Sequence, residues 1–209
     1  MRKTAKLGLA ALTAAAVLAS AVGSASARNL SVTNGSFRTT WAPLTFSEPF
    51  GFFTIRCNIT MEGSFHSTTI AKVIGSLIGY VTSARVQHPC TNGEAWAWNG
   101  TERFLRTGNS LPWHLTYEGF TGTLPNITGV RVLLVRPKFT VEFPGICLAT
   151  YQPANQNGTA IISAGTMRIQ AGTETSTAIE GECPRGSFNG TSTTVVLLNT
   201  TTPITIRLI

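Results

Sequence analysis

Aspartate is missing from this sequence, so all nine of its acidic residues are glutamates. The absence excludes EF-hand calcium loops, aspartate dyads and the Ser-His-Asp form of the catalytic triad. Chemistry that needs two carboxylates would have to use two glutamates. Charged residues of both signs make up only 12% of the chain, which leaves few candidates for such a pair.

Other signatures of chemistry are absent as well. The basic residues after position 27 are scattered, so we expect no nucleic-acid partner. The closest cysteines in the sequence, Cys57 and Cys90, are 33 positions apart (90 − 57), whereas zinc sites usually need close pairs. The chain has no G-x-S-x-G elbow and no H-E-x-x-H pair. We expect no metal ion and no cofactor. A zinc site built from the distant His66, His88 and His114 is the one metal alternative, and solvent-facing or core histidines are favoured over it.

The first 27 residues have the three parts of an export signal. Arg2, Lys3 and Lys6 give a positive start, residues 7–22 are almost uninterruptedly apolar, and Ala25-Ser26-Ala27 is a small-x-small cleavage site. Cleavage before Arg28 would leave 13 basic residues (16 − 3) against nine acidic ones, a net charge of +4 (13 − 9). No later stretch is apolar over the roughly 20 residues that a spanning helix needs. We expect a secreted protein, released or held at the cell surface, with no membrane span in the mature chain.

The four cysteines all follow this signal, and an even count in an exported chain predicts two disulfides. Self-comparison also indicates a duplication. The cysteines are 33 and 36 positions apart in the two halves (90 − 57 and 183 − 147), and each half repeats an Asn-Gly-Thr triplet. We expect β repeats over residues 28–119 and 120–209, with one disulfide in each, Cys57–Cys90 and Cys147–Cys183.

Segments rich in β-branched and aromatic residues dominate the mature part, and Gly, Pro and Asn separate them. These segments predict strands at residues 50–59, 130–135, 138–143, 193–198 and 204–209. Asn-Gly pairs starting at 34, 92, 99, 157 and 189 predict tight turns. The expected fold is all-β: an antiparallel β-sandwich, or two duplicated β-halves packed together, after a cleaved N-terminal signal helix.

The segment Ile70–Val81 fits two structures. Its apolar residues have helical spacing, but Gly75 and Gly79 weaken a helix interior. The matching segment of the second half, residues 160–169, lacks the helical stripe. We favour strand in both halves, although the pattern leaves helix open.

Three tryptophans are the candidate ligand-binding residues. Trp96 and Trp98 would face the same side of a strand, and Trp113 precedes an alternating run. Exposed rings can stack on a sugar while polar neighbours bind its hydroxyls. The favoured alternative is that one or both rings fill the core over Cys57–Cys90, because large aromatic residues are usually buried.

The sequence therefore indicates a location more clearly than a reaction. The leading hypothesis is a non-catalytic extracellular binding or surface-associated protein, whose partner would be a cell-wall or other extracellular glycan, or another extracellular protein. An extracellular hydrolase that uses Glu62 or Glu118 with a nearby His or Arg is a second hypothesis. A third is an inhibitor that presents residues 119–126 as a rigid loop.

Overall fold

The structure is a computed structural model that describes residues 29–48, 50–100, 109–163 and 166–209, so the expected signal at residues 1–27 lies outside the described residues. The described chain contains strands and no helix, which confirms the all-β class. The strands are β1 (Asn29–Val32), β2 (Ser36–Ser47), β3 (Thr54–Phe65), β4 (Thr69–Ala71), β5 (Leu77–Thr91), β6 (Glu94–Ala97), β7 (Trp113–Thr123), β8 (Asn126–Val135), β9 (Phe139–Phe143), β10 (Cys147–Tyr151), β11 (Asn155–Ser163), β12 (Thr166–Gly181), β13 (Arg185–Thr194), β14 (Val196–Leu197) and β15 (Ile206–Leu208). A search of the described residues for a helix long and apolar enough to span a membrane finds none.

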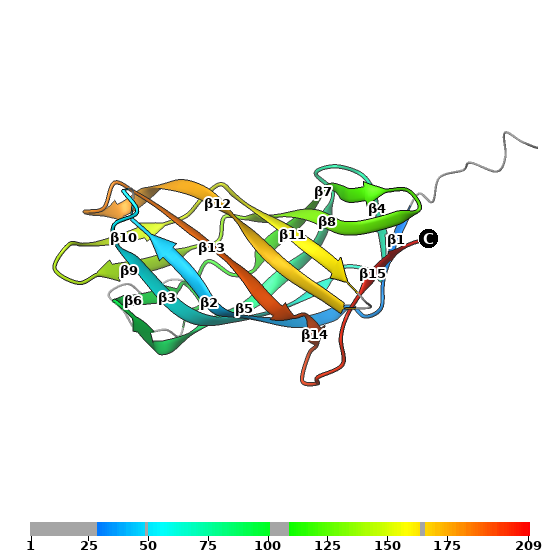
Figure 1. Cartoon of the computed structure of the whole chain (residues 1–209), viewed down its shortest axis with the longest axis horizontal. Coiled ribbons are helices and arrows are strands. Elements are labelled where there is room, and N and C mark those ends of the chain that lie inside the picture. The colour runs from blue at the N-terminus through cyan, green and yellow to red at the C-terminus, as the bar shows by residue number, and fades with distance from the viewer. Residues whose placement is uncertain (1–28, 49, 101–108, 164–165) are drawn as a thin grey trace, which may run out of the picture.

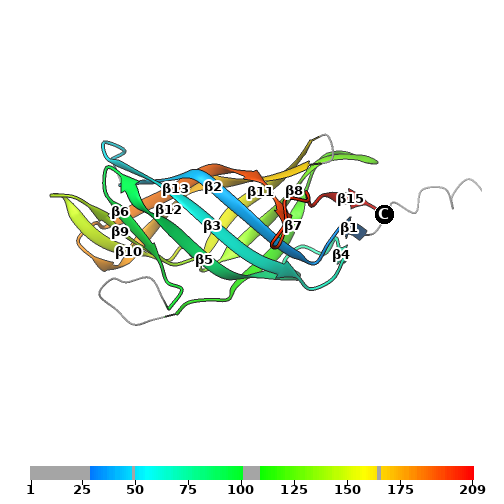
Figure 2. The same cartoon turned by 90° about the horizontal axis from the view of Figure 1, so that it is seen from below.

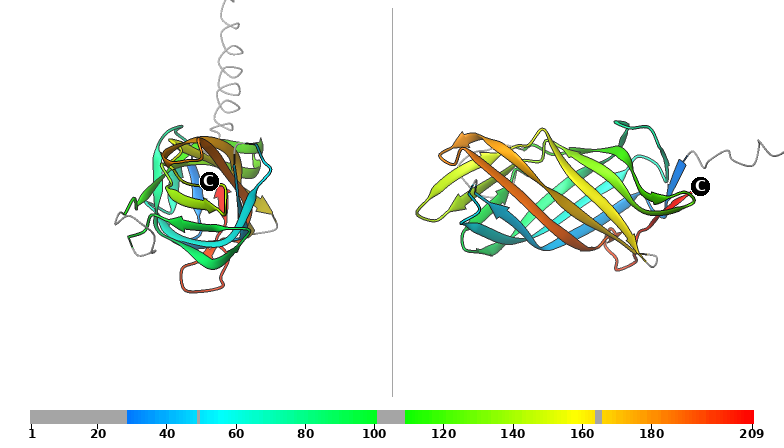
Figure 3. Two further views of the ribbon diagram at one scale, coloured as in Figure 1. Left: turned by 90° about the vertical axis from the view of Figure 1, so that its left-hand side faces the viewer. Right: turned by 45° about the horizontal axis from the view of Figure 1, so that its top comes forward.

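Eight of these strands form a closed ring. Their order is β11-β8-β7-β5-β3-β2-β13-β12, all neighbours are antiparallel, and β12 pairs back to β11. Seen end-on, the strands surround a central axis (Figure 3). The start of β12 pairs with β11, and its end pairs with β10. From there β10, β9 and β6 continue the sheet toward one end of the elongated molecule (Figure 1). The pairings thus give one self-closing sheet, and the two separate layers of a sandwich are not confirmed.

Alternation of side chains along β2 explains why the ring has an inside. Phe37, Thr39 and Trp41 are buried, and the residues between them are only half-buried. The alternation changes phase at Ala42 and Pro43, where the pairing with β3 shifts register, and Leu44 then points inward. A bulge of this kind adds a residue to one strand and keeps the apolar side chains on the core side.

A small second sheet lies at the end of the molecule where the C-terminus is found (Figure 2). Its order is β15-β1-β4. Leu30, Val32 and Ile206 from this sheet are almost fully buried and belong to the same hydrophobic core as the residues inside the ring. The small sheet therefore closes that end of the ring with apolar side chains.

Both predicted disulfides are present. Cys57–Cys90 joins β3 to β5, and Cys147–Cys183 joins the start of β10 to the turn after β12. The expected repeat boundary between residues 119 and 120 falls inside β7, and strands from both halves share the ring. The duplication itself stays a prediction.

Residues 70–81 form no helix. They divide between the end of β4, a bend at residues 72–76 and the start of β5, and Gly75 has a φ of 78° that suits the bend. The strand predicted over residues 50–59 begins only at Thr54. Of the predicted Asn-Gly turns, the pair at 92–93 connects β5 to β6, whereas the pairs at 157–158 and 189–190 lie within β11 and β13. The turn prediction was wrong for those two pairs because ladders on both sides hold them in strands.

Candidate functional site

The inside of the ring is not completely filled. A cavity of about 60 Å³ lies among side chains of all eight strands of the ring, including Phe37, Met61, Val132, Ile169 and Phe188. One water molecule needs a cavity of roughly 10–15 Å³, so this cavity has room for several water molecules. The wall is almost entirely apolar. Apolar cavities with a few polar groups are the usual form of small-molecule sites.

Three polar side chains in this wall are buried and incompletely paired. Thr39, Trp41 and Gln156 are 2%, 5% and 3% exposed. Within the described chain, Thr39 Oγ1, Trp41 Nε1 and Gln156 Oε1 have no hydrogen-bond partner. An unsatisfied buried polar group costs roughly 1–3 kcal/mol, so a packed core normally avoids it. Together they are a hydroxyl, an N–H donor and a carbonyl acceptor in one apolar wall.

The amide of Gln156 is held by the backbone. Its Nε2 donates to the carbonyl oxygens of Gly172 at 2.5 Å and Asn157 at 3.3 Å. These bonds direct the amide nitrogen toward β12 and leave the amide oxygen as the unpaired atom. The amide is therefore positioned by the strands and does not rotate freely.

The cavity is not sealed from solvent on every side. Leu115, Val132 and Leu134 in its wall are half-buried, and Asn157 is exposed. Those residues lie on β7, β8 and β11. A ligand larger than the cavity could therefore extend past these strands, with only its apolar part inside.

The structure separates the three candidate tryptophans. Trp96 and Trp98 are half-buried and alternate with the buried Ala95 and Ala97, so both lie on the outer face. Trp113 is 1% exposed, which takes it out of any surface platform. Its ring packs 5.4 Å from Phe139 between centroids.

Neighbouring side chains lie against the rings of the two outer tryptophans. The Lys138 ammonium lies 3.2 Å from the centre of the Trp98 ring, and Trp98 Nε1 donates to Thr140 Oγ1 at 2.9 Å. The His88 ring lies 5.9 Å from that of Trp96. One face of Trp98 is thus covered by a cation, which reduces the area available for stacking on a sugar.

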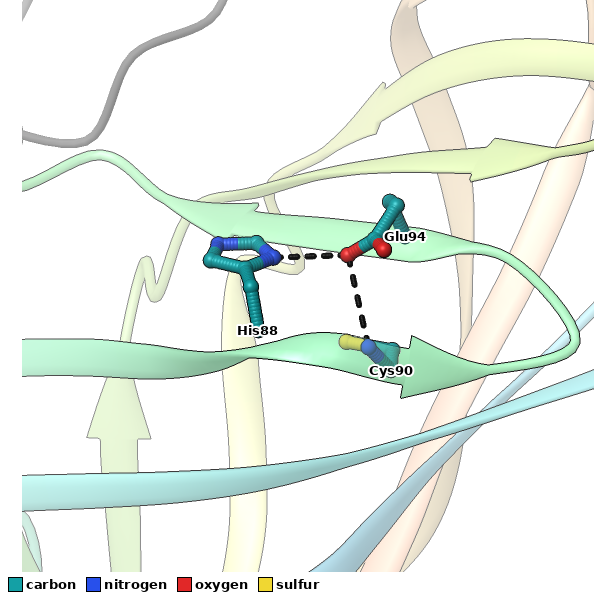
Figure 4. A group of neighbouring side chains, drawn as sticks. All are labelled: His88, Cys90 and Glu94. Carbon is teal, nitrogen blue, oxygen red and sulfur yellow. Dashed lines mark hydrogen bonds and ion pairs between the residues drawn. The ribbon is translucent and has the colours of Figure 1, made fainter.

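His88, Cys90 and Glu94 come together on the β5–β6 hairpin (Figure 4). His88 Nδ1 lies 2.6 Å from Glu94 Oε2, and the Cys90 backbone N–H donates to the same oxygen at 3.4 Å. Three potential ligands are grouped, but the Cys90 sulfur is bonded to Cys57 and is not a thiolate. Only two ordinary metal ligands remain, and a hydrogen bond between their side chains joins the two strands of the hairpin.

The other histidines are far from this hairpin. His66 and His114 lie against Tyr80, with ring centroids 4.6 and 5.0 Å from it. Along the β3–β5 ladder, Gln87 pairs with Asn58 and Gly79 with Phe65, which puts His66 roughly 30 Å from His88. The three histidines therefore do not meet in one zinc site.

The glutamates of the hydrolase hypothesis are also apart. Glu62 is on β3 and Glu118 is on β7, with β5 between them. Ser83 pairs with Glu62, whereas Thr116 pairs with Leu77 and Glu118 lies two residues further on, so the two glutamates are displaced by roughly 25 Å along the sheet. Thr116 Oγ1 donates to Glu118 Oε1 at 3.4 Å. The candidate inhibitor loop at 119–126 consists mainly of strand ends joined by a turn at residues 124–125.

One surface feature was missed in the sequence. Glu48 is 7% exposed, and its carboxylate accepts the backbone N–H groups of Phe50, Phe52 and Phe53 at 2.7, 2.6 and 3.3 Å. The three phenylalanine side chains then point outward. The β-type composition of this segment suggested a strand, and the signal for a turn was the glutamate before Pro49 and Gly51. Thr39 and Gln156 were missed because single polar residues in alternating strands look like solvent-facing positions.

Comparisons with protein families, with curated proteins and with solved structures find no match.

Proposed function

We propose that this chain is an exported, non-catalytic binding protein that holds a small, mostly apolar ligand, or the apolar part of a larger one, inside its ring of strands. The observation that carries the proposal is the apolar cavity whose wall contains the unpaired Thr39 Oγ1, Trp41 Nε1 and Gln156 Oε1. After a small side-chain movement, a ligand hydroxyl or carbonyl could pair with them. The paired cysteines fit an extracellular location.

The lining explains why the ligand should be uncharged. Among the residues that the structure describes, none with an ionisable side chain lines the cavity. A charge placed there would lose its hydration without gaining a counter-ion, which is strongly unfavourable. Short-chain alcohols and ketones match the cavity in size and polarity.

Filling the cavity tests this function. A Cβ at Gly158 would lie 3.5 and 3.6 Å from the Val132 and Ile169 side chains, so Gly158→Val places methyl groups in the cavity without a backbone clash. We expect the wild-type chain to show thermal stabilisation by members of a panel of short-chain alcohols and ketones. Gly158→Val should lower the affinity on the order of tenfold or more, because the binding volume is lost.

Thr159→Val is the matched control, since Thr159 neighbours Gly158 on β11 and is not part of the cavity wall. It should bind as the wild type does. Equal binding by Gly158→Val would place the bound compound outside the cavity, and stabilisation by none of the compounds would show that the cavity holds none of them.

The outer tryptophans support a second candidate, glycan binding. Trp96 and Trp98 share one outer face with His88, Glu94 and Lys138, which can bond to sugar hydroxyls. Retention on insoluble cell-wall polysaccharide should fall at least severalfold in a Trp96→Ala, Trp98→Ala double variant, because the sugar could no longer stack on the two tryptophan rings. Unchanged retention would remove this candidate, and the Gly158→Val variant serves as its control.

A further inference from the structure

The tip between β2 and β3 exposes the side chains of Phe50, Phe52 and Phe53 to solvent. The tip between β2 and β3 is closed by the Glu48 N–H, which donates to the Phe53 carbonyl oxygen at 3.3 Å, and by the Gly51 N–H, which donates to the Glu48 carbonyl oxygen at 3.1 Å. Gly51 has a φ of 74°, and a Cβ there would meet no other atom within 4 Å. The backbone of the tip is therefore fixed by short-range bonds, while its outer side is open.

The fixed backbone keeps aromatic rings in solvent. Phe50, Phe52 and Phe53 are 76%, 82% and 52% exposed. The rings of Phe50 and Phe52 lie stacked on each other with centroids 6.4 Å apart. A hydrophobic tip would ordinarily fold back onto the protein, but the buried Glu48 carboxylate holds the N–H groups inward and thereby directs the side chains outward. Contiguous exposed apolar surface of this kind usually marks a contact site.

Neighbouring hairpins extend the same apolar end. Ile146 in the β9–β10 turn is 41% exposed, and Ile179 near the end of β12 is 48% exposed. The β2–β3, β9–β10 and β12–β13 connections all lie at the end of the molecule opposite the C-terminus (Figure 1). Three separate convex tips therefore carry apolar side chains at one end.

We propose that this end docks on a neutral lipid surface, with Phe50 and Phe52 inserted at the interface. Separate convex tips fit a soft, deformable interior, whereas a folded protein would need a matching socket for each tip. Aromatic rings are favoured at the boundary between headgroups and acyl chains. The ionisable residues at these tips, Arg56 and Arg185 with Glu48, Glu142, Glu180 and Glu182, are not predominantly basic. The lipid should therefore be zwitterionic, since anionic surfaces attract clusters of Lys and Arg.

Flotation with phosphatidylcholine vesicles tests the proposal. All chains are compared without residues 1–27, because that apolar N-terminal segment would itself bind lipid if it stayed attached. We expect the wild type to float with the vesicles. A Phe50→Ser, Phe52→Ser variant should partition more weakly, on the order of tenfold for each ring that inserts fully. Vesicles that also contain phosphatidylglycerol should bind the wild type no better.

The opposite end of the molecule supplies the matched control. Val73 and Ile74, in the connection between β4 and β5, are 60% and 71% exposed. A Val73→Ser, Ile74→Ser variant removes a comparable apolar area far from the phenylalanines and should float as the wild type does. Near-ultraviolet circular dichroism checks that each variant is folded.

Four outcomes would overturn the proposal. Wild-type protein that stays at the bottom of the gradient, or a phenylalanine variant that floats equally well, would show that the tip does not bind lipid. Binding to phosphatidylglycerol vesicles alone would assign the interaction to charge. Sedimentation velocity that shows self-association, lost in the phenylalanine variant and without flotation, would assign the tip to a second copy of this chain. None of these outcomes depends on the cavity.

Discussion

A buried tyrosine, Tyr151, holds two strands together near the end of the molecule that carries the phenylalanine tip. Below the phenylalanine tip, Tyr151 donates its hydroxyl to the Arg185 carbonyl oxygen at 3.0 Å and so ties β10 to the start of β13. Its ring also occupies the space beside Gly186, where a Cβ would lie 2.6 Å from a ring carbon. Burial, and secondarily the charge of Glu48, raise the pKa of Tyr151 from 10.0 to about 12.

This raised pKa predicts a loss of stability at high pH. The folded state holds the phenolic proton more tightly than the unfolded chain, so the contribution is complete below pH 10 and disappears as the pH rises from 10 toward 12. Urea denaturation across that range should show a falling free energy of unfolding. The slope should be shallower in Tyr151→Phe, which has no proton to lose. Absorbance at alkaline pH should show a late phenolate step that the variant lacks, and an unchanged titration curve in the variant would contradict the assignment.

At the scale of elements, sequence patterns identified some of the fifteen strands and failed where local hydrogen bonds act against composition. Residues 130–135 and 139–143 are strands as β-branched and aromatic content predicts. Phe50–Phe53 have the same content but form a tip, because the Glu48 carboxylate bonds to the N–H groups of Phe50, Phe52 and Phe53. The disulfides were predictable because the two cysteines of each half are separated by a similar number of residues, which indicates one disulfide in each half.

The two disulfides should stabilise the chain by similar amounts. They close loops of 33 and 36 residues, for which the chain-entropy estimate is about 3–4 kcal/mol each. We expect Cys57→Ala, Cys90→Ala and Cys147→Ala, Cys183→Ala double variants to lose comparable free energy of unfolding in urea. Only the second should become sensitive to proteolysis in the β9–β10 turn, because Cys147 anchors that hairpin. Peptide mapping without reduction provides the check, and a link between Cys57 and Cys147 would contradict both expectations.

At the scale of the whole molecule, closure of the ring was beyond the reach of the sequence. Alternation along a strand such as β2 reveals which side chains face inward, but it carries no information on which strand lies next to it. The neighbour of β2 opposite β3 is β13, whose Ser187 pairs with Ser47 across 140 positions of the chain (187 − 47). The cavity depends on that closure, since its wall combines residues from the first and last strands of the ring. Thr39 and Gln156 could therefore not be recognised as neighbours of one site.

The same long-distance pairing has a kinetic consequence. A ladder between residues so far apart in sequence forms only after a large loss of chain entropy, and proteins dominated by such pairings fold slowly. The β2–β13 ladder joins residues 140 positions apart (187 − 47), so the ring cannot close before β13 has been synthesised. A chain with this topology stays unfolded longer than one built from local contacts. That delay suits the proposed export, because a chain that crosses a membrane unfolded must finish folding on the far side.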